Sequence, residues 1–228
     1  MTARRMDFFR MLARARWLTT SQVHRRFFGH ATVDAARRWL RAAVKTRHLI
    51  AYRTNRMSEI LFALGPEGKR VLERSGAGEI RLERTPPKQI EHLGGINDIR
   101  IAAELAASLS YFFAYWELPG LGWQYAIIPD AVFELSGKTF AAEFDRGLEA
   151  VKFFLRTKVA VYERGLEGLP LAALIIITDR KRRMENLMRA GAGRRLPIFL
   201  STLEQVQHHD LAAPIFYRYC DDQRIGLG

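Results

Sequence analysis

Cysteine is almost missing from this 228-residue sequence, which contains only Cys220. A single cysteine forms no disulfide framework within the chain and supplies no cysteine-based zinc site. The six histidines are scattered, and the adjacent pair His208 and His209 would point to different faces of a helix or strand. The sequence therefore excludes a disulfide-stabilised domain and a cysteine-based zinc domain.

Long hydrophobic runs are also lacking. The longest aliphatic run, residues 171–177, is far too short to cross a bilayer, and the basic N-terminus lacks an apolar segment of signal-peptide length. The sequence has neither a P-loop nor the glycine motif of dinucleotide-binding proteins, so no nucleotide cofactor is indicated. From these absences we expect a cytoplasmic protein with no membrane partner.

Acidic residues are scarce in the first two-fifths of the chain. Residues 1–88 contain 20 Lys and Arg against 7 Asp and Glu, whereas residues 89–228 contain 16 against 17. The net charge of +12 therefore comes entirely from the N-terminal part. This asymmetry predicts an N-terminal module that faces a polyanion and a C-terminal module with another role.

The pattern of the first ninety residues predicts three helices followed by a hairpin. Thr19 and Gln22 have the spacing of a capping box, and Thr32 is a candidate N-cap for the third helix. Alternation and turn residues then predict two strands and a short helix. The expected elements are helices at 6–15, 19–29 and 32–45, strands at 49–53 and 60–64, and a helix at 66–72. This order is that of a winged helix-turn-helix, which predicts that the protein binds double-stranded DNA.

The third predicted helix has an apolar face and a basic face. Its apolar residues recur at helical spacing from Val33 to Val44, and its basic residues cluster on the other side. An α-helix fits the major groove of DNA, and arginine can bind phosphate or guanine with two parallel hydrogen bonds. The predicted DNA-binding residues come from this face and from the hairpin tip: Arg37, Arg38, Arg41, Lys45, Arg53 and Arg56.

A glycine-rich stretch at 75–78 and the pair Pro86-Pro87 separate the two modules. We expect a DNA-binding domain at 1–84, a linker at 85–89 and a second domain at 90–228. The second domain has the expected order α-β-β-β-α-β-α-β, with the apolar run as a buried strand. The predicted fold class is therefore mixed α/β (α+β over the whole chain).

Three acidic residues flank a predicted hairpin in the second domain. If Ser136 and Gly137 form a two-residue turn, Asp130 lies directly opposite Glu143, and Asp145 shares that face because strand side chains alternate. Facing carboxylates destabilise a sheet unless a cation offsets their repulsion. The sequence therefore predicts a Mg²⁺ site, which Mn²⁺ could also occupy, formed by these three acids. A three-residue turn would place the acids on opposite faces.

The same residues resemble known families. Pro129-Asp130 before a hairpin, with an acidic residue on the next strand, resembles the restriction-endonuclease-like PD-(D/E)xK nuclease fold. The whole chain, a winged helix followed by Pro-Asp-Ala and then Glu-Phe-Asp-Arg-Gly, resembles the plasmid replication-relaxation family and the related nuclease-like relaxases. The resemblance implies that Asp130 and Glu143 are the two metal-binding acids of a nuclease site.

The sequence departs from the nuclease motif at one position. The motif has a lysine two residues after the second acid, where this chain has Asp145. We take Lys152, on the next predicted helix, as the candidate for a relocated lysine, with Glu149 about one helical turn before it. The predicted catalytic residues are Asp130, Glu143, Asp145 and Lys152.

Two functions stay open at this point. The first is a metal-dependent DNA-nicking nuclease or relaxase that acts in the replication or transfer of a plasmid or mobile element. The second is a non-catalytic DNA-binding regulator or replication initiator, in which the nuclease-like domain is a scaffold or the dimerisation unit of a homodimer. Nicking of DNA in the presence of Mg²⁺ or Mn²⁺ separates the two.

Overall fold

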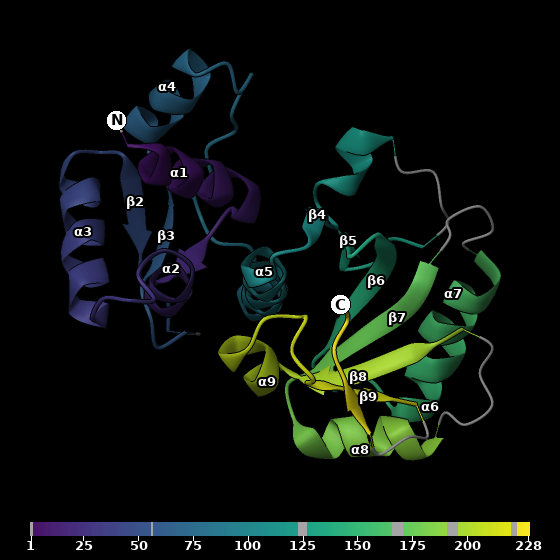
Figure 1. Ribbon diagram of the computed structural model, residues 1–228. Helices are drawn as coiled ribbons and strands as arrows, with labels where there is room; N and C mark the ends of the chain where they lie inside the picture. Colours follow the sequence, from purple (N-terminus) through teal and green to yellow (C-terminus); the bar gives the residue numbers. More distant parts are fainter. Residues whose placement is uncertain (1, 56, 123–126, 166–170, 191–195, 220–222) are drawn as a thin grey trace. The chain divides into compact units, whose positions relative to one another are not determined.

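The computed structural model describes residues 2–55, 57–122, 127–165, 171–190, 196–219 and 223–228. The chain divides into two compact units, Met1–Asn97 and Asp98–Gly228 (Figure 1). Each unit combines helices with a β-sheet, so the predicted mixed α/β fold class is confirmed at this level. The division between the units lies inside helix α5 (Ile90–Leu105), later than the predicted linker at 85–89.

Contacts made by the segment after residue 82 explain this later division. Arg16 binds both carboxylate oxygens of Glu83, from Nε at 2.6 Å and from Nη2 at 3.0 Å. The side-chain amide of Asn97, which is fully buried, donates to the carbonyl oxygens of Ala15 and Trp17 at 3.0 and 2.8 Å. The chain up to Asn97 is thus bonded to the N-terminal unit.

The N-terminal unit contains the predicted helices and hairpin. Its three strands form an antiparallel sheet in the order β1-β3-β2. The capping box is confirmed, because the side chain of Thr19 accepts from the Gln22 amide and the side chain of Gln22 accepts from the Thr19 amide. Thr32 caps the third helix by accepting from the Ala35 amide at 3.3 Å. The elements are α1 (Ala3–Ala15), β1 (Leu18–Thr19), α2 (Thr20–Phe27), α3 (Val33–Lys45), β2 (Leu49–Tyr52), β3 (Leu61–Leu64) and α4 (Pro66–Arg74).

The C-terminal unit is built on a seven-stranded sheet in the order β10-β9-β8-β7-β6-β5-β4. Strands β4, β5 and β6 form an antiparallel meander, whereas β6, β7 and β8 are parallel and are joined by helical connections. The elements are β4 (Leu109–Ala114), η1 (Leu118–Leu121), β5 (Ala131–Leu135), β6 (Lys138–Asp145), α6 (Val151–Phe154), η2 (Leu155–Val159), α7 (Ala160–Gly165), β7 (Leu171–Thr178), α8 (Lys181–Ala190), β8 (Ile198–Thr202), α9 (Leu203–His208), β9 (Phe216–Arg218) and β10 (Arg224–Ile225).

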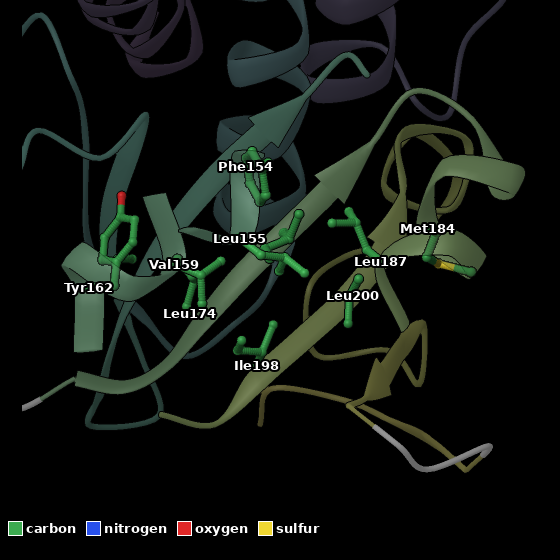
Figure 2. Packing of buried hydrophobic residues seen from close by; sticks show 11 residues of the cluster. Phe154, Leu155, Val159, Tyr162, Leu174, Met184, Leu187, Ile198 and Leu200 are labelled. Atoms are coloured by element: carbon green, nitrogen blue, oxygen red, sulfur yellow. The ribbon is translucent and has the colours of Figure 1, made fainter. Parts of the chain in front are cut away.

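The helices between β6 and β8 pack on one face of this sheet and bury an apolar cluster (Figure 2). Full burial of each large aliphatic side chain contributes about 1.5–3 kcal/mol to stability relative to exposure. Tyr162 belongs to this cluster, and its hydroxyl bonds to Glu143 on β6. The labelled members are Phe154, Leu155, Val159, Tyr162, Leu174, Met184, Leu187, Ile198 and Leu200. Packing in this cluster therefore positions Tyr162 beside Glu143.

Candidate functional site

The hairpin between β5 and β6 has the predicted two-residue turn. Ser136 and Gly137 both have positive φ angles, of 50° and 73°, as the common two-residue hairpin turn requires. Leu135 pairs with Lys138, and the register continues to the pair formed by Ala131 and Ala142. The predicted register is confirmed over these pairs, and its continuation by one step would set Asp130 opposite Glu143.

Glu143 is the centre of a buried polar group. Its side chain is 2% exposed, and each carboxylate oxygen accepts a hydrogen bond from a helix packed on the sheet. The hydroxyl of Tyr162 donates to Oε1, and Nζ of Lys158 donates to Oε2 at 2.6 Å. Burial, helped by the negative charge of Asp130, raises the pKa of Glu143 to about 7, and the bonds from Lys158 and Tyr162 limit the rise.

The two donors to Glu143 titrate outside the neutral range. Burial alone would lower the pKa of Lys158, but the carboxylates of Glu143, Asp130 and Glu149 outweigh burial and raise it. Burial and the charge of Glu143 raise the pKa of Tyr162 well above its ordinary value. At neutral pH Lys158 is therefore a cation and Tyr162 a neutral donor. The Lys158 side chain is 40% exposed, so part of it reaches solvent while its ammonium group binds Glu143.

Asp130 is also held in place. It is buried, and its Oδ2 accepts from the backbone amide of Phe144 at 2.8 Å. This bond brings the carboxylate of Asp130 beside β6, where it acts on the pKa of Glu143 and of Lys158. The structure therefore brings together two predicted acids, Asp130 and Glu143, and one lysine that the sequence did not single out.

Asp145 lies on the same face of β6 as Glu143 but binds a different partner. Its Oδ2 accepts from Nε of Arg183 on α8 at 2.6 Å, and its Oδ1 accepts from the amide of Gly147 at 2.9 Å. The side chains of Asp145 and Arg183 are only 5% and 10% exposed. Within the described part of the chain, no three acidic, histidine or cysteine side chains gather as metal ligands. Among the described residues Asp145 is therefore paired with Arg183, and the metal site formed by three carboxylates stays a prediction.

Lys152 is exposed in the first turn of α6, and Glu149 is exposed just before that helix. The lysine that reaches Glu143 is instead Lys158, six residues further along. It lies in η2, a π-helical turn, and Tyr162 follows in α7. Apolar residues on either side of Lys158 anchor this helix in the core, which was the available signal that Lys158 and Tyr162 face the sheet.

The predicted DNA-facing residues lie on the exposed surface of the N-terminal unit. The apolar residues Ala36, Leu40 and Ala43 of α3 are buried, and the basic residues are on the opposite side. Arg37 forms an exposed ion pair with Asp34 at 2.9 Å. The exposed basic residues are Arg37, Arg38, Arg41, Lys45 and Arg53. Arg56, the sixth predicted residue, lies outside the described residues.

Three basic residues of this surface line a groove. Arg37 and Arg41 come from α3, and Arg53 follows β2. The groove has a volume of about 410 Å³ and also includes Glu59, just before β3. The structure thus gathers cations from two elements on one side of the N-terminal unit.

These features define a two-unit mixed α/β protein with a basic helix face in one unit and a buried acid-lysine group in the other. The chain belongs to the replication-relaxation family, whose model matches residues 9–169, more than two thirds of its length. The matched range includes α3, the hairpins of both units and Lys158. A comparison with curated proteins gave no match. Membership of this family indicates a role in replication or relaxation.

Among the helices that the structure describes, none has the length and apolar composition needed to cross a membrane.

Proposed function

We propose that this protein binds double-stranded DNA through α3 and the β2–β3 hairpin, in the manner of a winged helix-turn-helix. The observation that carries the proposal is the exposed basic face of α3 opposite its buried apolar face. A helix of this kind can enter the major groove, and the hairpin arginine extends the cationic surface. The replication-relaxation family supports a role in the replication or transfer of a plasmid or other mobile element.

The DNA-binding proposal is tested with the triple variant R37A/R38A/R41A, measured against wild type on a fluorescent duplex at several salt concentrations. Affinity for the duplex should fall strongly. The slope of log K against log salt is negative, and its magnitude should become smaller by about two to three, because each lost phosphate contact reduces that magnitude by about 0.9. K69A/R70A/R74A on α4 is the matched control, since it removes the same charge from another surface of the same unit. Equal losses in both variants would reject a specific role for α3.

A second candidate function is metal-dependent cleavage of DNA by the C-terminal unit. It is favoured by the group of Asp130, Glu143 and Lys158, since a PD-(D/E)xK-like site needs two acids and a lysine. Mg²⁺ is commonly held by one or two carboxylates and completes its shell with water and substrate phosphate, so Asp130 and Glu143 fit it as ligands. A bound cation would supply an activated water and stabilise developing negative charge. Lys158, partly exposed beside Glu143, would bind the phosphate.

The cleavage proposal is tested by incubating supercoiled plasmid with the protein and Mg²⁺ or Mn²⁺. We expect nicking by wild type, and its loss in D130N and K158M with duplex binding retained, because binding is assigned to the other unit. If wild type binds DNA but never nicks it with any divalent metal, the protein is a non-catalytic regulator or initiator. The bonds to both oxygens of Glu143 favour that alternative, since Lys158 balances the negative charge and Tyr162 satisfies the second oxygen without a metal.

A further inference from the structure

The groove between α3 and the hairpin contains a carboxylate among its cations. Arg37, Arg41 and Arg53 line this groove, and so does Glu59. Each arginine favours phosphate, whereas Glu59 repels it. A carboxylate in this position therefore weakens the attraction of the groove for the phosphate backbone of any DNA sequence.

Glu59 is fixed in the groove by helix α2. Its Oε1 accepts from the backbone amide of Ser21 at 3.0 Å and from the Ser21 hydroxyl at 2.9 Å. Ser21 lies in the first turn of α2, where the backbone amides have no partner within the helix. The positive end of the helix dipole also favours a carboxylate there. Glu59 is half-buried, and moving its carboxylate out of the groove would break both bonds to Ser21.

We propose that Glu59 is a specificity-determining residue of the DNA-binding groove: it excludes phosphate and admits a base edge that carries an amino group. This inference rests on the proposed DNA-binding function of the N-terminal unit. A glutamate can accept a hydrogen bond from the amino group of cytosine, and adenine also presents an amino group in the major groove. Three arginines without Glu59 would bind the backbone of any sequence, whereas the acid makes close approach depend on the base that it meets.

The variant E59Q isolates the charge of this side chain. The glutamine oxygen can still accept from Ser21, so the contact between the hairpin and α2 is kept while the negative charge is removed. Binding of the full chain to a random-sequence duplex should become about fivefold tighter, the size expected for one like-charge contact in water. The gain should shrink at higher salt, because exposed charges are screened. Equal thermal unfolding of E59Q and wild type would show that the fold is unchanged.

The matched control is E67Q on α4, which makes the same change in net charge outside the groove lining. Its affinity for random duplex should equal that of wild type. Selection from a randomised duplex provides the second readout: wild type should enrich cytosine or adenine at one position, and E59Q should lose that preference at the same position.

Each outcome has a distinct meaning. If E59Q binds random duplex no more tightly than wild type, or if E67Q gains as much, Glu59 only anchors the hairpin and the inference is overturned, while DNA binding by α3 stands. The same holds if E59Q retains the base preference of wild type. If neither wild type nor E59Q binds duplex at all, the proposed DNA-binding function itself fails.

Discussion

Replacing Glu143 by glutamine should change how the stability of the protein depends on pH. In the folded chain burial raises the pKa of Glu143 from 4.5 to about 7, so between these values the folded state binds more protons than the unfolded state. The free energy of unfolding must therefore fall as pH rises through this window, and it levels off above about pH 7. A shift of this size corresponds to about 3 kcal/mol, because one pKa unit is about 1.4 kcal/mol.

The assay is urea unfolding of wild type and E143Q at several pH values between about 5 and 8, without divalent metal. All other titrating groups are common to both proteins, so the difference between their unfolding free energies isolates Glu143. Glutamine has no carboxyl group to titrate, so the difference should move in favour of E143Q by about 3 kcal/mol as pH rises across the window. The difference in unfolding free energy at any one pH also includes the lost ion pair with Lys158. The prediction therefore concerns how this difference changes with pH.

A difference between E143Q and wild type that stays constant across this pH range would refute the reasoning. It would mean that Glu143 titrates near its ordinary pKa in the folded chain, so that burial and Asp130 do not act on it as the structure indicates. E134Q on the same hairpin is the control, because Glu134 is only half-buried. The difference between E134Q and wild type shows how much of the change comes from removing any carboxylate of this hairpin.

Three further variants test the contacts around the site and the boundary between the units by urea unfolding at neutral pH. Tyr162→Phe should lower the free energy of unfolding by about 2 kcal/mol, as expected for a hydrogen bond to a charged group, and should move the pH range in which Glu143 titrates upward. An unchanged urea midpoint would contradict the bond. Arg183→Met should cost about 3 kcal/mol by leaving Asp145 buried and unpaired, and adding Asp145→Asn should recover part of that loss, so equal losses in the single and double variants would count against the pair. Asn97→Ala should lower the free energy of unfolding by about 2 kcal/mol, because two buried hydrogen bonds to the carbonyls of Ala15 and Trp17 are lost; a loss near zero would argue that the N-terminal unit ends earlier.

Local chemistry was sufficient to predict several parts of this structure. The capping box at Thr19 and the N-cap at Thr32 depend on residues within one helical turn, so the starts of α2 and α3 could be predicted. The hairpin register depended on Ser136 and Gly137 alone, because a two-residue turn determines every pair in the ladder that follows. The opposition of Asp130 to Glu143 was therefore available from the sequence.

The partners of the acids could not be predicted, because they come from elements that the sequence does not place. Arg183 reaches Asp145 only because β6 and β7 are parallel neighbours, so that α8, which follows β7, begins beside the end of β6. The sequence analysis selected Lys152, although the apolar residues beside Lys158 were a signal that Lys158 faces the sheet. The π-helical turn between α6 and α7 changes the rotation of the helix, and it is Lys158 that faces Glu143.

The amino-acid sequence by itself determined the two-faced helix α3, the uneven distribution of charge, the order of most elements and the pairing of two acids across a hairpin. These features depend on spacing along one segment or on composition. Tertiary structure alone decided which cations meet the acids, that Glu59 lies among the arginines of the groove, and that the units divide inside α5. These features depend on packing between segments far apart in the chain, for which periodicity and turn chemistry carry no information.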